Sequence, residues 1–146
     1  GVNILNDECI FCEIIQGDIP AVKVYETDDT LAFMDIGPLS EGHTLVIPKV
    51  HGCMLHELPD AVVGALLISI KKVAHAVIKA NNTDHYNVLN NNGSFAGQVV
   101  KHVHFHIIPR VAGDKLLGNW PAGSYPEGRM QAVAQKITEA LKEIDD

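Results

Sequence analysis

The stretch that decides the fold is KHVHFHIIPR, residues 101–110. Histidines at positions 102, 104 and 106 alternate with apolar residues at 103, 105 and 107. Successive side chains of an extended strand point to opposite faces, so this alternation predicts a strand with imidazoles on one face and apolar groups on the other. Histidine has an unperturbed pKa near neutrality, which makes this face a candidate chemical surface. An edge strand with a histidine-rich polar face is the alternative, and strict alternation argues against it.

The size and composition of the chain suit one soluble domain. It has 146 residues, of which 47% are hydrophobic and 20% are charged. This length allows one domain over residues 1–146 with a substantial core, and is too short for two of ordinary size. No run approaches the roughly 18 apolar residues that span a membrane. The N-terminus lacks an export signal, so we expect a cytoplasmic protein, with the nucleus as an alternative location, and no membrane partner.

The net charge limits the kinds of partner. A formal charge of −7 argues against broad binding to nucleic acid, which needs a basic surface. A small phosphorylated ligand remains compatible, because one local site can be positive within an acidic protein.

Apolar periodicity, together with glycine and proline, predicts the order of the elements. Strands are expected over 22–26, 31–36, 42–49 and 85–89, with the histidine strand as the fifth. Helices are expected over 9–16, from Pro59 to about Asn81, and over 129–144. The predicted fold class is therefore α+β: an antiparallel five-stranded sheet backed by one long helix, with a short N-terminal and a longer C-terminal helix.

The histidine stretch can carry covalent catalysis. A neutral imidazole can attack an electrophilic phosphorus or carbonyl and form a covalent intermediate. Its other nitrogen must be held as a donor, often to a backbone carbonyl, so that the attacking nitrogen keeps its lone pair. A neighbouring group must also help the leaving group to depart, a role worth roughly 10²–10⁴ in rate. Alternating histidines supply both the attacking imidazole and the group that assists the leaving group. His104, at the centre, is best placed for attack.

The loop before this stretch is a candidate site for an anion. Glycines 93 and 97 let backbone N–H groups approach an anion closely, and Asn91, Ser94 and Gln98 add neutral donors. An ordinary hairpin turn is the alternative, which the adjoining histidines make the less favoured one. Asp35 ends a strand beside a Gly-Pro loop and could accept from sugar hydroxyls, although loop aspartates are also common turn formers.

Cys9 and Cys12 form a Cys-x-x-Cys pair that could bind a metal. Thiolates and imidazoles suit Zn²⁺, and a Cys₂His₂ site would be closed and structural. Buried thiols and a redox pair are the alternatives, and the redox one is disfavoured because the motif does not follow a strand in a βαβ pattern. His51 and His102 are the candidate histidine ligands. On sequence alone they compete with His43, His56, His75 and His85.

Residues 102–108 resemble the histidine-triad (HIT) motif, His-φ-His-φ-His-φ-φ, where φ is apolar. The segments CIFCEII (9–15), AFMDI (32–36), GHTLVIPK (42–49) and GQVVK (97–101) agree with it. The resemblance runs from about residue 8 to Trp120 and is closest to the Hint-like branch of small, homodimeric, nucleotide-binding enzymes. It implies a HIT-like fold, a homodimer and a purine nucleotide such as AMP as ligand.

The resemblance also implies roles for individual positions. His104 would be the nucleophile in the hydrolysis of nucleoside 5′-phosphoramidate-type substrates, forming a nucleotidyl-histidine, and His106 would contact the phosphate and assist the leaving group. The implied nucleotide-binding residues are Asp35, Ile36, His43, Asn91, Gln98 and Val99, the last through its backbone N–H. The implied ligands of a structural Zn²⁺ are Cys9, Cys12, His51 and His102.

Some positions depart from the Hint-like pattern. Val99 stands where Hint enzymes usually carry serine and Fhit-type enzymes threonine, and valine cannot donate a side-chain hydrogen bond to a leaving atom. Lys101 and the Pro109-Arg110 ending resemble Fhit-type enzymes, so a dinucleoside polyphosphate hydrolase is an alternative, as is a nucleotide-binding scaffold with weak catalysis. The Cys-x-x-Cys element and Trp120-Pro121 favour the Hint-like branch, in which the C-terminal segment reaches the partner's active site.

Overall fold

The computed structural model describes residues 5–144, which divide into two compact units, one ending at Asp114 and one beginning at Lys115. The first unit holds a five-stranded sheet, helices α1 and α2 and two short 3₁₀ turns. The second holds helix α3, Arg129–Lys142. The expectation of one domain over residues 1–146 stays a prediction.

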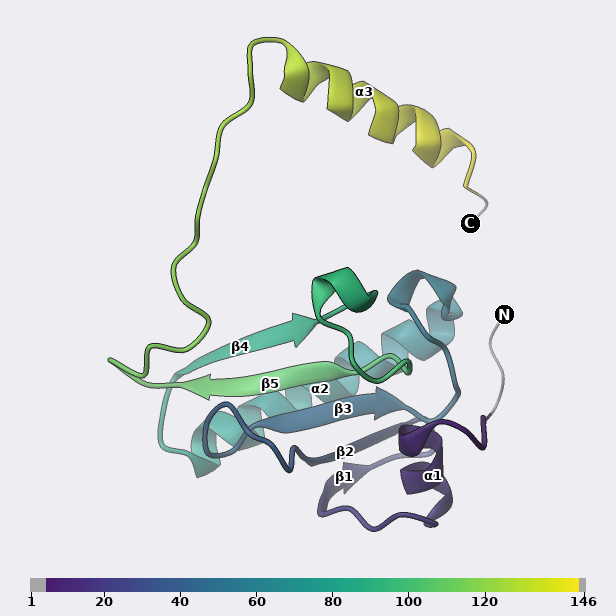
Figure 1. The fold of residues 1–146 in the computed structure, drawn as a ribbon. Helices are drawn as coiled ribbons and strands as arrows, with labels where there is room; N and C mark the ends of the chain where they lie inside the picture. The colour runs from purple at the N-terminus through teal and green to yellow at the C-terminus, as the bar shows by residue number, and fades with distance from the viewer. Residues whose placement is uncertain (1–4, 145–146) are drawn as a thin grey trace. The chain divides into compact units, whose positions relative to one another are not determined.

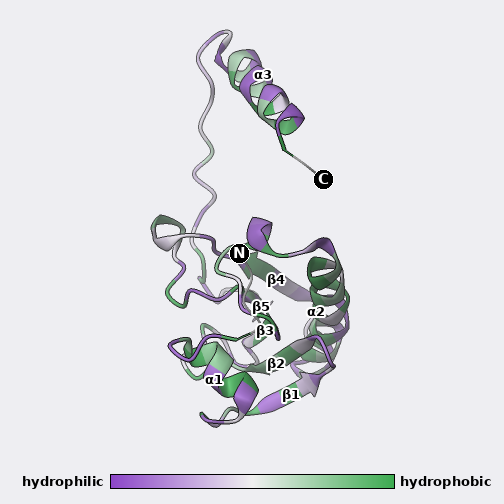
Figure 2. Ribbon diagram, turned by 90° about the vertical axis from the view of Figure 1, so that its right-hand side faces the viewer, coloured by the Kyte–Doolittle hydropathy of each residue, from purple (hydrophilic) through white to green (hydrophobic). Residues whose placement is uncertain are grey.

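The sheet is antiparallel throughout and has the strand order β1-β2-β3-β5-β4 (Figure 1). The strands are β1 Lys23–Glu26, β2 Thr30–Met34, β3 Thr44–Pro48, β4 His85–Asn90 and β5 Phe105–Arg110. Helix α2, Asp60–Ala80, covers one face of the sheet and α1, Ile10–Gln16, lies on the other (Figure 2). The predicted fold class is confirmed.

Alternate residues of the central strands feed two separate cores. On one face Ala32, Val46 and Ile107 pack with α2. On the other face Phe33 and Leu45 pack with α1. The two-residue period of a strand therefore separates a purely structural core from the core that lies beside the site.

The alternation of the histidine stretch is present, but its strand begins later than predicted. Val103 and Phe105 are buried in the core next to α2, as the pattern indicated. The strand pairing, however, starts only at Phe105, opposite Val46 of β3 and Asn90 of β4. The expectation that the strand already includes His102 and His104 was wrong. The chain is held there by isolated hydrogen bonds instead, such as the 2.8 Å bond from Val103 N–H to the carbonyl of Gly52.

Helix α2 backs the sheet with one apolar stripe. It begins after Pro59, where the missing N–H costs nothing, and ends at Asn81. Its buried residues recur at helical spacing: Leu66, Ser69, Ile70, Val73, Ala74 and Val77. Within residues 5–144 it is the one helix long and apolar enough to cross a membrane, which is weak evidence because core helices of soluble proteins pass the same test.

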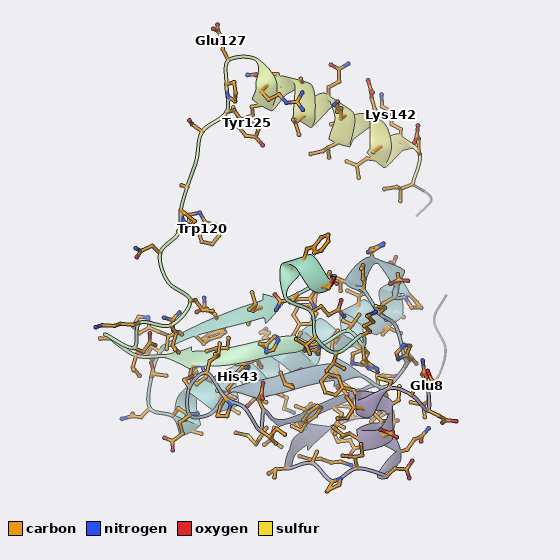
Figure 3. All side chains as sticks on the ribbon, in the orientation of Figure 1. Glu8, His43, Trp120, Tyr125, Glu127 and Lys142 are labelled. Atoms are coloured by element: carbon orange, nitrogen blue, oxygen red, sulfur yellow. The ribbon has the colours of Figure 1, made fainter. Side chains whose placement is uncertain are left out.

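The second unit consists of an irregular segment followed by the amphipathic helix α3. The predicted helix is present, and none of its residues is buried. Trp120 and Tyr125 project from the irregular segment (Figure 3). The expectation that the segment around Trp120 reaches a partner subunit stays a prediction.

Candidate active site

A cavity of about 420 Å³ is bordered by α1, the end of β2 and the loop that precedes the histidine stretch. Its apolar wall includes Ile10, Phe11, Ile14, Phe33 and Leu45. Its polar groups include Asp35, Asn91, His104 and His106. A pocket of this volume, mostly apolar with a few convergent polar groups, is typical of a small-molecule site.

His104 is held in the tautomer that a nucleophile requires. Its Nδ1 lies 2.7 Å from the carbonyl oxygen of His102. A carbonyl can only accept, so Nδ1 carries the proton and donates it. The lone pair is therefore on Nε2 of a ring that lines the cavity. This is the donor arrangement that the sequence analysis required of an attacking imidazole.

A second chain of hydrogen bonds fixes His106. The backbone N–H of Leu39 donates to Nδ1 of His43 at 3.0 Å, so the proton of neutral His43 is on Nε2. That Nε2 lies 2.9 Å from Nδ1 of His106 and donates to it. His106 consequently carries its own proton on Nε2 and can offer it to a ligand. His43, labelled in Figure 3, thus acts behind His106 and does not line the cavity wall.

Burial keeps these imidazoles neutral. It lowers the pKa of His104 below 6.5, although its bond to the His102 carbonyl and the charge of Asp35 oppose the shift. The pKa of His106 falls to about 4, mainly through burial, with His104 and His43 adding to the effect. Burial also lowers the pKa of His43. Neutral rings at pH 7 agree with the tautomers that the hydrogen bonds assign.

We expect the acid limb of kcat/KM to lie below pH 6.5, because protonating His104 removes the lone pair needed for attack and its pKa is lowered in the folded chain. Asp35→Asn should move the limb to still lower pH, since the Asp35 carboxylate raises the pKa of both cavity histidines. A pH–rate profile from about pH 4 to 8 measures both effects.

Thermal melts at each pH supply the control for unfolding. The unfolded chain binds protons at the ordinary histidine pKa, so the stability from neutral buried rings is complete above pH 6.5 and is lost as the pH falls toward the lower folded values. An acid limb centred at or above pH 6.5 in a protein that is still folded would contradict the assignment of a neutral His104.

Asp35, the predicted ribose-binding residue, and Ile36, predicted to line the purine pocket, both lie in the cavity wall. Asp35 follows β2, lines the cavity, and accepts a 2.8 Å hydrogen bond from Gly37 N–H through Oδ1. Its Oδ2 lies 3.4 Å from Nε2 of His43. Ile36 lines the cavity and is fully exposed, so its side chain is free to cover a ligand.

The predicted phosphate-binding residues are only partly brought together. Asn91 and Val99 line the cavity, and the side chain of Val99 is 89% exposed. Gln98 does not line it. The Gln98 amide donates to the carbonyls of Cys53 at 2.7 Å and Val100 at 3.1 Å, and accepts from Gly93 N–H at 2.7 Å. Because its polar atoms are engaged with the backbone, Gln98 braces the loop, and its role in binding a nucleotide stays a prediction.

The four predicted metal ligands converge in a second, mostly buried cluster. The Sγ atoms of Cys9 and Cys12 and the Nδ1 atoms of His51 and His102 all lie within 4.8 Å of one another. Nδ1 of His102 is 3.4 Å from Cys9 Sγ, 3.5 Å from Cys12 Sγ and 3.3 Å from His51 Nδ1. A tetrahedral zinc site with bonds of about 2.0–2.3 Å has ligand–ligand edges of about 3.3–3.8 Å. The cluster therefore has the donor set and the dimensions of such a site.

The protonation of the cluster also suits a metal. Nε2 of His102 donates to the carbonyl of Pro48 at 2.9 Å, which directs the lone pair of Nδ1 toward the cluster. Burial lowers the pKa of His102 to about 4 and raises that of the Cys12 thiol to about 11. A metal ion that bound there would be coordinated by the neutral imidazole of His102 and would replace the proton of the Cys12 thiol.

Asp35, His43 and His106 form another group of possible ligands within the described residues. Both nitrogens of His43 are already engaged, one by Leu39 N–H and one by His106. No lone pair is left on His43 for an ion, so this group is better described as a hydrogen-bond relay.

Phe11 is a site residue that the sequence analysis did not single out. Its ring meets those of His102 and His104 edge to face, with centroids 5.9 Å and 5.1 Å away. It thus lies between the metal cluster and the cavity. The sequence signal for Phe11 was that it is an aromatic residue between the two cysteines, on the buried side of α1 with Cys12 and Ile14.

These features define a class: a small α+β protein in which neutral imidazoles line a ligand cavity beside a Cys₂His₂ cluster. The family model of the HIT domain matches residues 16–113. The chain belongs to the HIT family, as the resemblance indicated.

Named proteins and solved structures of the same family are similar to this chain over most of its length. Adenosine 5′-monophosphoramidase HNT1 of Saccharomyces cerevisiae is 48% identical over 97% of this chain and 87% of its own length. The crystal structure of a histidine triad nucleotide-binding protein from Candida albicans is 43% identical, covers 94% of this chain and 99% of its own, and has a TM-score of 0.83. A Zn-bound histidine triad family protein from Mycobacterium smegmatis is 34% identical, covers 90% and 96% of the two chains, and has a TM-score of 0.70.

Proposed function

We propose that this chain is a nucleotide hydrolase or transferase that cleaves nucleoside 5′-phosphoramidate-type substrates, such as an adenosine 5′-phosphoramidate, through a covalent nucleotidyl-His104. The observation that carries the proposal is the tautomer of His104, whose Nδ1–H is held by the His102 carbonyl while Nε2 is free in a ring that lines the cavity. The similarity to monophosphoramidases supports the choice of substrate class.

The proposed reaction has two displacements at phosphorus. Nε2 of His104 attacks and forms an N–P bond while the bond from phosphorus to the leaving nitrogen breaks, and the leaving amine takes up a proton. Water then attacks the same phosphorus, the His104–P bond breaks, and the nucleoside monophosphate is released. His106 donates its Nε2–H to a phosphate oxygen or the leaving atom, and His43 holds that tautomer.

The remaining walls bind the nucleotide in this proposal. Asp35 accepts from the ribose hydroxyls, Ile36 and the apolar wall contact a purine such as that of AMP, and Asn91 with the backbone N–H of Val99 holds the phosphate. Gln98 supports that loop from behind.

A substrate panel at equal concentrations tests the substrate class. We expect kcat/KM to be higher for an adenylyl phosphoramidate than for a dinucleoside polyphosphate or an adenylyl sulfate. Val99→Ser should raise turnover of the phosphoramidate, because a hydroxyl at this exposed position can donate to the leaving atom. A clear preference for the dinucleoside polyphosphate would instead support the second candidate function.

That second candidate, a dinucleoside polyphosphate hydrolase, rests on Lys101. It lines a hollow beside the cavity, and the two share Val99 and Val100 in their walls. The ammonium group of Lys101 would pair with the negative charge of a longer phosphate chain. Arg110 gives no such support, because its guanidinium is bonded to Asp114 and Asn87.

The Cys₂His₂ cluster is proposed to hold a structural Zn²⁺ that ties the N-terminal turn to the histidine stretch. The edge lengths of the cluster and the Zn-bound relative support this assignment. All four positions would be filled by the protein, so the bound ion would contribute to folding and leave the chemistry to the imidazoles.

A homodimer is proposed through β4, one of the two edge strands of the sheet. β4 is an edge strand, and its Tyr86 and Val88 are 43% and 42% exposed. On α2, Leu67 and Ile68 are also exposed, and Ile68 lines a surface hollow together with Tyr86. Unpaired backbone groups and exposed apolar side chains at an edge suit pairing with a second copy. The cytoplasmic location expected from the sequence stays a prediction.

A further inference from the structure

The carbonyl of His104 has an unusual partner. The pairing of β4 with β5 ends at Asn90 opposite Phe105, so His104 lies one residue before the paired strand. Next to this last pair, Nδ2 of Asn90 donates to the His104 carbonyl at 2.9 Å. His104 itself is buried, so without this bond its carbonyl would lose a side-chain donor at a buried position.

Asn90 is in turn held by Asn92. Nδ2 of Asn92 donates to Oδ1 of Asn90 at 2.6 Å, and Oδ1 of Asn92 accepts from the backbone N–H of Leu55 at 2.8 Å. The direction of this series of amides is fixed at both ends. Leu55 N–H can only donate and the His104 carbonyl can only accept, so neither asparagine amide can flip without losing a bond.

The segment at the far end of the series is itself braced. Gly52 accepts from Val103 N–H at 2.8 Å, and Cys53 accepts from the Gln98 amide at 2.7 Å. Leu55 then begins the short turn Leu55–Glu57. Residues 52–55 therefore form a backbone anchor that contacts both the histidine stretch and the loop before it.

We propose that Asn90 and Asn92 are positioning residues, which form one amide relay from this anchor to the carbonyl of His104. The relay fixes the backbone at His104 and so directs Nε2 of its ring, whose Nδ1 is tied to the neighbouring carbonyl of His102. The inference rests on the proposed function of His104 as nucleophile. Neither asparagine lines the ligand cavity, so their effect on the reaction is exerted through His104.

Two changes remove the donor role of Asn90: Asn90→Asp is near-isosteric but adds a negative charge, and Asn90→Ala is the uncharged counterpart that controls for this charge. Asn90→Asp keeps an acceptor for Asn92 and loses the donor to His104, and Asn90→Ala loses both. We expect either change to lower kcat for the phosphoramidate by roughly tenfold to a hundredfold, the scale of a small misplacement of a reacting group. KM should stay within about twofold, because the ligand contacts are untouched.

Coupling between the two asparagines separates a relay from general loss of structure. Asn92→Ala should lower kcat in the wild-type background and have no further effect once Asn90 is alanine. Thr83→Val is the matched control: the Thr83 hydroxyl also donates to a carbonyl of β5, that of Arg110 at 2.8 Å, but at the end of the strand away from the site. It should alter thermal stability and leave kcat unchanged.

A nitrogen-15 NMR spectrum of the imidazoles gives a readout that needs no turnover. The wild type should show a slowly exchanging Nδ1–H on His104, and Asn90→Asp should exchange it faster. A wild type with this signal but without turnover would contradict the proposed function alone. Folded Asn90→Asp and Asn92→Ala proteins with wild-type kcat and wild-type exchange, or additive effects of the two alanine changes, would overturn the relay.

Discussion

His104→Ala should lower turnover of an adenylyl phosphoramidate by a factor on the order of 10⁴ to 10⁶, the scale of losing the nucleophile in a covalent mechanism. The reason is structural: Nε2 of His104 is the unprotonated nitrogen of a cavity ring whose other nitrogen is held by the His102 carbonyl. His106→Ala should cost less, roughly 10²–10⁴, because it removes assistance to the leaving group and leaves the attacking atom in place.

Two further variants guard this prediction. His104→Asn can keep a donor toward the His102 carbonyl and should be as inactive as the alanine variant while melting closer to the wild type. His75→Ala changes an exposed histidine of α2 outside the cavity wall and should be fully active. Substantial turnover by folded His104→Ala would exclude His104 as the nucleophile.

Cys9→Ser should lower both the zinc content and the stability of the protein. The change removes one of four ligand atoms that lie within 4.8 Å of one another. Losing a site that was saturated about a thousandfold above its Kd would lower the free energy of unfolding by about 4 kcal/mol. Metal analysis and thermal melts measure the two effects, and the wild type should hold about one Zn²⁺ per chain.

Cys53→Ser provides the control for general thiol loss. Cys53 is a free cysteine close in sequence to His51 but outside the four-ligand group, so its change should leave the zinc content at the wild-type level. A metal content that is the same in Cys9→Ser and the wild type would show that the cluster is not the zinc site.

The fold could be read from the sequence because its signals are local. The alternation at 102–107 reports which side chains face α2, and Val103 and Phe105 are buried there as expected. The start of the strand could not be read in the same way. It depends on where β3 and β4 stop offering partners, which is at Val46 and Asn90.

The roles of the site residues were harder to predict from the sequence where residues of the same type have different partners in the fold. Asn90, Asn91 and Asn92 are adjacent and identical, yet only Asn91 lines the cavity. The side-chain amide of Gln98 is of a type that can bind a phosphate, but in the folded chain it is hydrogen-bonded to backbone groups. Residue type states what a side chain can bind, and the tertiary position of the backbone decides which partner it meets.

The predicted zinc ligands were also only partly recognisable from local sequence. The spacing of Cys9 and Cys12 could be recognised locally, whereas the choice of His51 and His102 over the other histidines depended on long-range contacts. The family resemblance supplied that choice before the geometry did. In the fold, the path of the chain after β3 brings His51 to within 3.3 Å of His102.

Intact-protein mass spectrometry with a slowly turned-over adenylyl substrate is the most direct test of the central claim, that His104 forms a covalent nucleotidyl intermediate. The account predicts a mass increase of one nucleoside monophosphate, located on His104 by peptide fragmentation and missing in His104→Ala. A wild-type protein that binds nucleotide but shows neither adduct nor turnover, or that carries the adduct on another residue, would contradict it.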